Sequence, residues 1–359
     1  MSDELNLDNS QLCCHDKRPL LISGPCSAES EVQVVETAKQ LKDIGINIFR
    51  AGIWKPRTRP DTFEGMGSIA LPWLKRAKEE TGVLTATEVA NVWHVKEAIN
   101  HGVDILWIGA RTTANPFAVQ EIADALRGYS IPVFVKNPIN PDIELWIGAL
   151  QRLNKVGLKN LIAVHRGFSY YGDNSYRNPP QWEIPIELKR RIPDIPIVTD
   201  PSHICGSKDL LFNVSQTAMD LDFDGLFIET HYKPHEALSD KDQQLTPAQL
   251  KDMLDRLILR SHDVKSSQQL EGLEGLRRQI DQWDEELLRV LRSRMAISEA
   301  IGAYKKKENI TILQTNRWSE ILEDRLRKSQ ALGLSDQFII QIFKQVHQES
   351  INFQNRVMN

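Results

Sequence analysis

The sequence predicts an α/β fold, a parallel (β/α)₈ TIM barrel, followed by a small all-α domain of three helices that dimerises. Three observations support this prediction. Eight apolar segments of strand length recur at regular intervals over roughly 245 residues, which is the usual size of such a barrel. Segments with helical periodicity lie between them. Beyond residue 260 the strand-like segments stop, and only long amphipathic segments remain.

The eight predicted strands are apolar along their length and end in polar or charged residues, as expected of a parallel barrel with its chemistry at the carboxyl ends. They span residues 20–27, 47–54, 83–89, 105–111, 133–137, 161–167, 197–203 and 225–231. Helices are predicted between them, for example at 31–44, 117–126 and 143–156, and 250–259 is predicted to be the eighth barrel helix. A doubly wound open sheet is the alternative fold, but it does not require eight evenly spaced units.

A change of composition marks the predicted domain boundaries. The barrel takes residues 18–260, the polar segment 261–269 is a linker, and the helical domain takes residues 270–359. Its first helix, 270–307, carries an apolar stripe that includes Leu276, Ile280 and Leu287. Because a helix of this length cannot bury such a stripe inside a small monomer, we expect a homodimer at least. Further helices are predicted at 316–331 and 335–357.

Charge and cysteine content exclude several classes of partner. The net charge is −4 and no basic block is present, which argues against nucleic acid and membrane surfaces. No segment approaches the length of about 18 apolar residues that a membrane span needs. The four cysteines show neither a disulfide framework nor zinc-type spacing, so we expect a reducing, cytoplasmic location.

Two sets of residues are predicted to meet at the carboxyl-terminal rim of the barrel. One consists of five cations: Lys55, Arg57, Arg111, Lys136 and Arg166. Any one of them alone could be an ordinary surface ion pair, but five at successive strand ends favour a small, highly anionic substrate, most simply a phosphorylated one.

The other set combines a thiol, an imidazole and two carboxylates: Cys26, His203, Glu229 and Asp240. Together these groups could bind a divalent manganese, iron, cobalt or zinc ion. Spacing alone leaves open that Cys26 is a buried structural cysteine.

The segments around these residues resemble those of type I 3-deoxy-D-arabino-heptulosonate 7-phosphate (DAHP) synthases, and the compact β-subfamily is the most similar. The resemblance spans about residues 20–259 with every motif in order: Gly24-Pro25-Cys26-Ser27, Lys55-Pro56-Arg57-Thr58, Ile108-Gly109-Ala110-Arg111, Lys136-Asn137, His165-Arg166-Gly167, Asp200-Pro201-Ser202-His203, Ile228-Glu229 and Leu238-Ser239-Asp240. It implies condensation of phosphoenolpyruvate with erythrose 4-phosphate, the first step of the shikimate pathway of aromatic amino acid biosynthesis.

The resemblance also implies a role for each group of residues. Cys26, His203, Glu229 and Asp240 match the metal ligands, so one divalent ion per barrel is expected, with Mn²⁺ first and Fe²⁺, Co²⁺ or Zn²⁺ as alternatives. Arg111, Lys136 and Arg166 then match the residues that bind phosphoenolpyruvate, and Arg57 and Thr58 match those that bind the phosphate of erythrose 4-phosphate. Lys55 reaches both substrates, and Glu88 lies near the reacting centre. Lys55, Glu88, Lys136 and His203 are the expected catalytic residues.

One related activity remains as an alternative for the barrel. Synthases of 3-deoxy-D-manno-octulosonate 8-phosphate share the barrel and the chemistry but use a five-carbon sugar phosphate. They typically have Lys-Ala-Asn-Arg where this chain has Lys55-Pro56-Arg57-Thr58, which favours the DAHP reading. Arg59 departs from the serine expected in the subfamily, and the sequence assigns it no role.

Cations of the first C-terminal helix indicate a second site. At a rise of 1.5 Å per residue, Arg294 and Lys305 lie roughly 16 Å apart on one face, whereas Arg277 is about 25 Å from Arg294 and points elsewhere. These three residues cannot bind one small molecule from a single straight helix. A two-fold dimer would resolve this, because Arg277 could then serve the site of the other copy.

Residues from about 270 to 358 resemble the all-helical chorismate mutases. Arg277, Arg294, Lys305, Arg317, Ser350 and Gln354 fall at the spacing of that family. The resemblance implies that the arginines bind the two carboxylates of chorismate, while Lys305 and Gln354 act as catalytic hydrogen-bond donors to its ether oxygen.

Two positions depart from that family. Trp318 stands where many relatives have a glutamate that binds the substrate hydroxyl, and Gln314 replaces an aspartate. Two hypotheses follow: a working mutase that holds the hydroxyl differently, or a regulatory module that binds chorismate or prephenate without turnover. In both, we expect the helical domain to give feedback control of the barrel.

Overall fold

The computed structural model describes residues 3–10, 12, 19–55, 63–172, 174–260, 267–313 and 315–358. The chain divides into two compact units, Met1–His262 and Asp263–Asn359. Of the predicted linker, residues 261–266 lie outside the described part, and residues 267–269 already belong to the first helix of the second unit, α11 (Ser267–Lys307).

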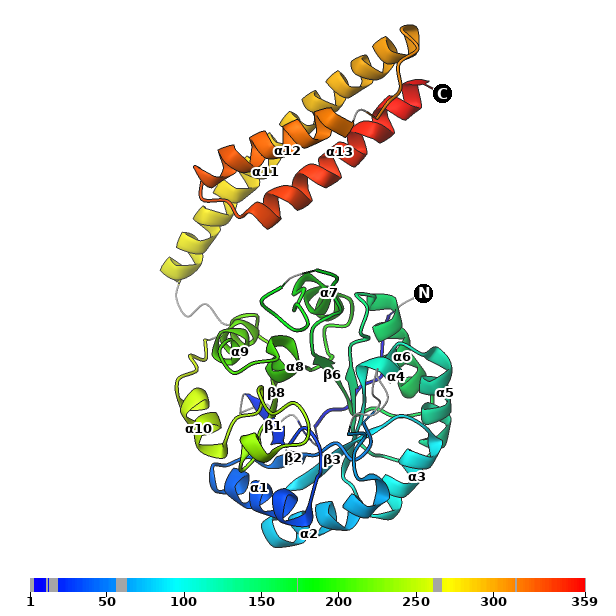
Figure 1. Ribbon diagram of the computed structural model, residues 1–359, viewed down its shortest axis with the longest axis vertical. Coiled ribbons are helices and arrows are strands. Elements are labelled where there is room, and N and C mark those ends of the chain that lie inside the picture. The colour runs from blue at the N-terminus through cyan, green and yellow to red at the C-terminus, as the bar shows by residue number, and fades with distance from the viewer. Residues whose placement is uncertain are drawn as a thin grey trace. The chain divides into compact units, whose positions relative to one another are not determined.

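The first unit is a closed barrel of eight parallel strands in chain order, with β8 paired to β1 (Figure 1). The strands are β1 (Leu20–Gly24), β2 (Ile48–Arg50), β3 (Leu84–Val89), β4 (Ile105–Ile108), β5 (Val133–Lys136), β6 (Leu161–His165), β7 (Ile197–Thr199) and β8 (Gly225–Glu229). The barrel prediction is confirmed at all eight segments. Most strands are shorter than predicted at their carboxyl ends, where residues such as Cys26, Arg111 and His203 leave the ladder and form the rim, whereas β3 loses only Val83 at its start.

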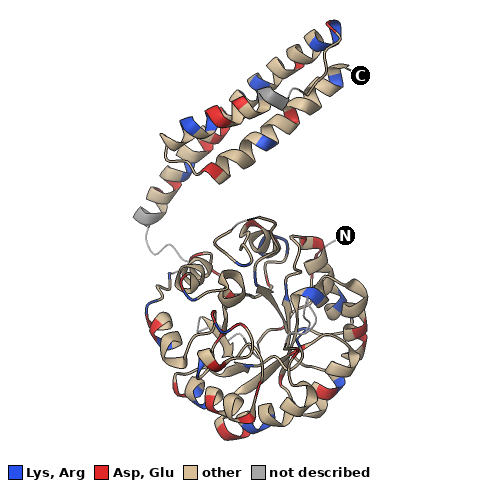
Figure 2. Cartoon of the chain, viewed as in Figure 1, with Lys and Arg blue, Asp and Glu red and all other residues tan. Residues whose placement is uncertain are grey.

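The described part of this unit contains ten helices. Most of them cover the outside of the barrel, whereas the short helices α4 and α8 directly follow β4 and β7 at the rim. The ten are α1 (Glu31–Asp43), α2 (Leu71–Thr81), α3 (Val92–Asn100), α4 (Ala110–Thr113), α5 (Pro116–Ala125), α6 (Ile143–Lys155), α7 (Glu183–Arg191), α8 (Pro201–Cys205), α9 (Leu211–Asp220) and α10 (Pro247–Asp255). Short 3₁₀ turns lie at Gly67–Ala70 and Pro234–Glu236. The eighth barrel helix, α10, begins earlier than predicted because Thr246 and Gln249 form a reciprocal cap at its start. Acidic and basic residues are spread over these outer helices, whereas the strands are largely uncharged (Figure 2).

Two apolar layers explain why the strands are apolar on both faces. Alternate residues of β4 show the arrangement: Ile105 and Trp107 point into the barrel, whereas Leu106 and Ile108 pack against the helices. Inside the barrel the Trp107 and Phe227 rings meet edge to face with centroids 5.4 Å apart. These two rings form an apolar floor beneath the polar residues at the carboxyl ends of the strands.

The second unit consists of three helices, α11, α12 (Thr315–Gln330) and α13 (Asp336–Met358), with α11 packed along α13 (Figure 1). Gly302 permits this packing, because a Cβ at this position would lie 2.9 Å from the Cα of Gln354. On α11 the apolar stripe stays exposed: Leu276, Ile280 and Trp283 are exposed by 61%, 60% and 74%. Among the described residues, no helix is long and apolar enough to cross a membrane.

Candidate active sites

A glycine at the end of β1 directs Cys26 toward the centre of the rim. Gly24 has φ +153°, and a Cβ there would lie 2.0 Å from the carbonyl oxygen of Arg50, so only glycine lets β1 and β2 approach this closely. The chain then turns through Pro25, and the Cys26 side chain is fully buried. Its Sγ lies 3.0 Å from Oδ2 of Asp240, and it also contacts the Lys55 ammonium.

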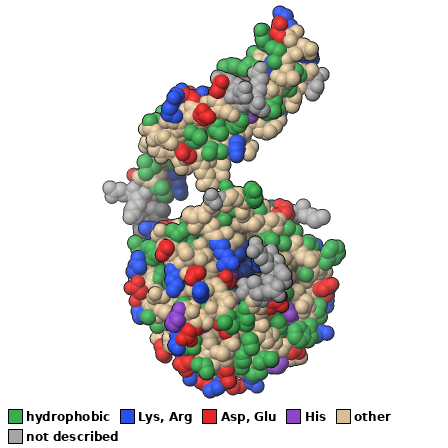
Figure 3. All heavy atoms as spheres, viewed as in Figure 1, with side chains coloured by type: hydrophobic (Ala, Val, Ile, Leu, Met, Phe, Trp, Pro, Cys, Tyr) green, Lys and Arg blue, Asp and Glu red, His purple; other side chains and the backbone are tan. Residues whose placement is uncertain are grey.

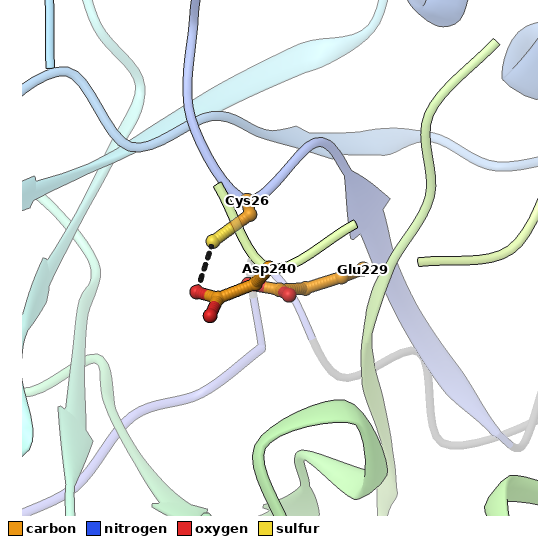
Figure 4. A group of neighbouring side chains, drawn as sticks. All are labelled: Cys26, Glu229 and Asp240. Carbon is orange, nitrogen blue, oxygen red and sulfur yellow. Dashed lines mark hydrogen bonds between the residues drawn. The ribbon is translucent and has the colours of Figure 1, made fainter. Parts of the chain in front are cut away.

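Cys26, Glu229 and Asp240 form a compact cluster, with one donor atom from each within 4.8 Å of the others (Figure 4). Glu229 is the last residue of β8 and is fully buried, and Asp240 comes from the loop that follows this strand. The structure therefore brings together three of the four predicted metal ligands, although Cys26 is more than 200 residues from either carboxylate in the sequence.

His203, the fourth predicted ligand, lies beside this cluster. We expected it at the end of a strand, but it lies in helix α8, which begins after Asp200. Asp200 holds the imidazole Nδ1 at 2.8 Å, which leaves Nε2 3.6 Å from Oε1 of Glu229. A carboxylate on the far nitrogen is the arrangement that orients metal-binding histidines.

The charges of the cluster depend on burial and on three neighbouring basic residues. Burial opposes ionisation of Asp240, yet the charges of Lys55 and His203 outweigh it and hold the pKa of Asp240 well below its ordinary range. The pKa of Glu229 is also lowered, because His203 and Arg50 outweigh burial. Burial raises the pKa of the Cys26 thiol, and the charge of Glu229 raises it further.

The donor set fits a divalent first-row metal ion, because it combines a thiol, carboxylates and an imidazole at one point. The Lys55 ammonium contacts Cys26 and lies 3.8 Å from Oδ2 of Asp240, so a positive charge already lies against these two ligands at the point where a metal ion would bind. Binding of a metal ion there would have to displace the proton of Cys26.

Four of the five predicted cations, those that the structure describes, line one cavity next to this cluster. A cavity of about 140 Å³ is lined by Lys55, Glu88, Arg111, Lys136, Arg166, Arg177, Asn178, His203 and Asp240. In Figure 3, Lys and Arg side chains gather around a hollow in the barrel face. Arg111 lies in α4 rather than at the end of a strand, which is a second correction of placement. Arg57, Thr58 and Arg59 lie outside the described residues.

Two of these cations are held by hydrogen bonds to polar side chains. Lys136 donates to Asp200 at 2.9 Å and lies over the Phe227 ring at 4.9 Å. Burial lowers the pKa of Lys136, and it lowers the pKa of Arg166 to about 10. Arg166 donates to Oδ1 of Asn178 at 2.8 Å.

Glu88 is positioned by a tryptophan and a glycine. The Trp107 indole donates to Oε2 of Glu88 at 3.0 Å. A Cβ on Gly109 would lie 2.1 Å from Oε1 of Glu88, so glycine at this position leaves the space that the carboxylate occupies.

Sequence reasoning missed several residues that line the cavity or contact the metal cluster. Arg50 is 2% exposed, donates to Glu229 at 3.0 Å and lies over the Phe227 ring. An arginine inside an apolar strand was a usable signal, because arginine is almost never fully buried unless it is paired. Arg177, Asn178 and Gln243 lie in irregular segments, where no sequence pattern marked them.

The helical unit brings together part of the second predicted site. Arg294 of α11 contacts the Ser350 hydroxyl of α13, and Ser350 and Gln354 are both buried. Lys305 donates to the carbonyl oxygen of Ile312 at 2.6 Å. Among the described residues, Oε1 of Gln354 is buried without a hydrogen-bond partner.

The other residues predicted for this site contact different partners or are not described. Arg277 is ion-paired with Glu274 on its own helix at 2.7 Å. Trp318 stacks on His347 with ring centroids 4.2 Å apart. The side chains of Gln314 and Arg317 are not among those described.

Comparison with known proteins identifies both units. The DAHP synthetase I family matches residues 4–266, and the chorismate mutase type II family matches residues 276–355. A phospho-2-dehydro-3-deoxyheptonate aldolase of Thermotoga maritima is 31% identical over 225 residues, which are 63% of this chain and 64% of that protein. This chain thus spans less than two thirds of that relative. A 2-dehydro-3-deoxyphosphooctonate aldolase of Francisella philomiragia is 26% identical over 270 residues, 70% of this chain and 94% of that protein.

Solved structures agree with this assignment. The structure of a phospho-2-dehydro-3-deoxyheptonate aldolase (DAHP synthase) from Thermotoga maritima has a TM-score of 0.59 at 29% identity, covering 65% of this chain and 66% of that one. A truncated form of the 3-deoxy-D-arabino-heptulosonate 7-phosphate synthase from Thermotoga maritima has a TM-score of 0.57 at 26% identity, covering 65% and 83%. The chain therefore belongs to the DAHP synthetase I family, with a chorismate mutase type II domain at its carboxyl-terminal side.

Proposed function

We propose that the barrel condenses phosphoenolpyruvate with erythrose 4-phosphate to DAHP and phosphate, and that the helical unit converts chorismate to prephenate. The observation that supports the first activity is one small cavity lined by four described cations, Lys55, Arg111, Lys136 and Arg166, and by Asp240 of the thiol–carboxylate cluster. Such a cavity suits two small phosphorylated substrates that must be held beside a metal ion. We place the protein in the cytoplasm, where the Cys26 thiol stays reduced.

In the proposed reaction, the cations orient phosphoenolpyruvate and the cluster orients the sugar. Bound by Cys26, His203, Glu229 and Asp240, a divalent ion, with Mn²⁺ the first candidate, would supply Lewis-acid polarisation of the aldehyde. Arg111, Lys136 and Arg166 hold the charged groups of phosphoenolpyruvate so that its alkene carbon can attack the aldehyde carbon. Water then adds to the resulting cationic carbon, and phosphate leaves.

Lys55 and Glu88 are proposed to complete the barrel site. Burial lowers the pKa of Lys55, but its electrostatic interactions with Cys26 and Glu229 outweigh it, so the net pKa lies above the ordinary value and the ammonium stays charged. It can neutralise the charge that develops on the aldehyde oxygen. Glu88 is held beside the reacting carbons by Trp107. Arg57 and Thr58 are proposed to bind the phosphate of erythrose 4-phosphate.

The mutase assignment is supported by the polar face shared by α11 and α13. There Arg294 contacts the Ser350 hydroxyl, with Gln354 one turn further along α13 and Lys305 further along α11. Arg317 and the Arg277 of a second copy would complete the carboxylate site. The exposed apolar stripe of α11 is the surface through which we propose that two copies pair. Lys305 and Gln354 would stabilise charge on the ether oxygen as its bond breaks.

Metal depletion tests the barrel activity. We expect the full chain to lose synthase activity after chelation and to regain it with Mn²⁺, and we expect Cys26→Ala to remain inactive at the same Mn²⁺ concentration. Arabinose 5-phosphate in place of erythrose 4-phosphate tests the octulosonate alternative. Metal-independent turnover, or preference for the five-carbon sugar, would contradict the proposed reaction.

Chorismate turnover separates the two hypotheses for the helical unit. A working mutase consumes chorismate, and Lys305→Ala abolishes this while the metal-dependent synthase activity of the same chain remains. Binding of chorismate without turnover would instead favour the regulatory module. Such an outcome would be explained if Trp318, which stacks on His347, filled the place where the substrate hydroxyl must bind.

We also propose that prephenate or chorismate bound to the helical unit inhibits the barrel. Such control requires two arrangements of the chain that differ in ligand affinity. Titration of prephenate into the Mn²⁺-loaded synthase assay tests it. An unchanged rate at concentrations that saturate the helical unit would refute the proposal.

A further inference from the structure

One buried glutamine next to the metal cluster has both ends of its amide occupied. Gln243 is 1% exposed and follows Asp240 in the loop after β8. Its amide nitrogen donates to Oε2 of Glu229 at 2.7 Å, and its amide oxygen accepts from Nη1 of Arg177 at 2.9 Å. Since the two ends have a carboxylate and a guanidinium as partners, the amide can take only one orientation.

The same guanidinium nitrogen reaches the second carboxylate of the cluster. Nη1 of Arg177 donates to Oδ1 of Asp240 at 2.9 Å. A continuous chain of hydrogen bonds therefore runs Glu229–Gln243–Arg177–Asp240. It joins two proposed metal ligands through two residues that are not ligands, and we call Gln243 and Arg177 the carboxylate clamp.

The clamp determines which oxygen each carboxylate presents to the cluster. With Oδ1 of Asp240 held by Arg177, Oδ2 lies 3.0 Å from Sγ of Cys26. With Oε2 of Glu229 held by Gln243, Oε1 faces Nε2 of His203 at 3.6 Å. Each carboxylate thus has one oxygen on the clamp and the other directed toward the remaining ligands.

The position of Arg177 is itself determined by packing. Gly206, which ends helix α8, has φ +70°, and a Cβ there would lie 2.6 Å from Cβ of Arg177. The backbone nitrogen of Arg177 also donates to the carbonyl oxygen of Cys205 at 3.3 Å. The arginine stem therefore lies over a glycine that leaves room for it, next to the helix that carries His203.

We propose that Gln243 and Arg177 are positioning residues of the metal centre, which set the geometry of Glu229 and Asp240 before the ion binds. This inference rests on the metal site of the proposed function and adds two residues to it. Two ionised carboxylates repel each other in a buried site, so rotation away from the cluster is favourable unless hydrogen bonds oppose it. Outer partners of metal ligands typically contribute about 10- to 100-fold to metal affinity.

Direct metal titration of the full chain tests the clamp without using turnover. After chelation, Mn²⁺ binding is measured by calorimetry, and Co²⁺ binding by the absorption band of its thiolate complex, for wild type, Gln243→Met and Arg177→Met. We expect each variant to bind Mn²⁺ about 10- to 100-fold more weakly. The double variant should lose less than the product of the two single losses, because both residues belong to one chain of hydrogen bonds.

Gln120→Met is the matched control. Gln120 accepts a hydrogen bond from Arg152 at 3.2 Å on an outer helix and does not line the cavity, so the same chemical change there should leave metal affinity unaltered. Thermal unfolding of the metal-free forms identifies variants that fail to fold. Arg177, whose side chain is 48% exposed, is the variant expected to fold normally.

The metal titrations can overturn the clamp in three ways. Equal Mn²⁺ affinity in wild type and in folded Arg177→Met would overturn the clamp, as would an equal loss in Gln120→Met. A wild-type chain that binds neither Mn²⁺ nor Co²⁺ would overturn both the cluster and the clamp. Weakened binding in the two variants, in a chain that shows no synthase activity, would support the clamp and contradict only the proposed reaction.

Discussion

Replacement of Arg50 by methionine tests whether the polar layer above the barrel floor is a coupled ionic network. Arg50 is 2% exposed, donates to Glu229 at 3.0 Å and lies 3.9 Å from Asp200. Its guanidinium carbon is 4.5 Å from the Phe227 ring centroid and 5.1 Å from that of Trp107. Methionine preserves most of the apolar stem but removes the charge, so two buried carboxylates lose a partner.

The size of the effect follows from these contacts. Removal of one partner from a buried ion pair costs about 3–5 kcal/mol, because the other charge stays buried. For a domain of this size, each kcal/mol lowers the unfolding midpoint by about 2–4 °C, so we expect the metal-free barrel to unfold about 10 °C lower. Mn²⁺ should recover part of this loss, because the ion would supply positive charge beside Glu229.

Circular dichroism during heating, without metal and then with Mn²⁺, measures both quantities. Arg50→Lys is the control: it keeps the charge but lacks the planar group that stacks between the rings, so an intermediate midpoint is expected. If Arg50→Met unfolds at the wild-type temperature in the absence of metal, the buried carboxylates do not depend on Arg50, and the reasoning is wrong.

Three further predictions concern other parts of the chain. Gly109→Ala should displace Glu88, lower the synthase kcat and cost about 1–3 kcal/mol of stability, whereas Gly148→Ala, with open space around it, should do neither; equal kinetics would contradict the role of Glu88. Burial lowers the pKa of His165 to about 4, whereas unfolded histidine titrates near 6.5. As the pH falls through this range, the unfolded chain takes up the proton before the folded chain does. The free energy of unfolding should therefore decrease by up to about 1.4 kcal/mol for each unit of falling pH. In denaturant titrations at several pH values, the free energy of unfolding of His165→Phe should depend less steeply on pH. Trp283→Glu on the exposed stripe of α11 should convert the proposed dimer to monomers in analytical ultracentrifugation, whereas Arg289→Glu should leave it dimeric. If both variants remain dimers, pairing through that stripe is refuted.

The fold could be predicted because its signal is local and repeated. Each strand, such as β4 or β8, is apolar on both faces, and each is followed by a helix of suitable length. Strand ends were less predictable. The segment at 197–203 was expected to be one strand, but β7 stops at Thr199 because the Asp200 side chain caps α8, and His203 therefore lies on a helix.

From the sequence, the metal ligands could be predicted only from their side-chain types, not from any evidence that they lie close together. Cys26 and Asp240 are separated by 214 residues, and no spacing rule relates them. Their meeting within 3.0 Å follows from barrel closure, which places β1 beside β8. The residues around them, Arg50, Gln243 and Arg177, could not be identified as a group, because their roles consist of contacts to residues from other strands and loops.

The sequence by itself determined the barrel, the helical domain and the chemical types available at the strand ends, since periodicity and residue chemistry are properties of the chain. Only the tertiary structure decided which side chains share a cavity and which oxygen of each carboxylate faces the cluster. It also showed that Arg50 is buried beneath the site. The physical reason is that hydrophobic patterning acts between neighbours along the chain, whereas hydrogen bonds and buried ion pairs act over a few ångströms between segments that only folding brings together.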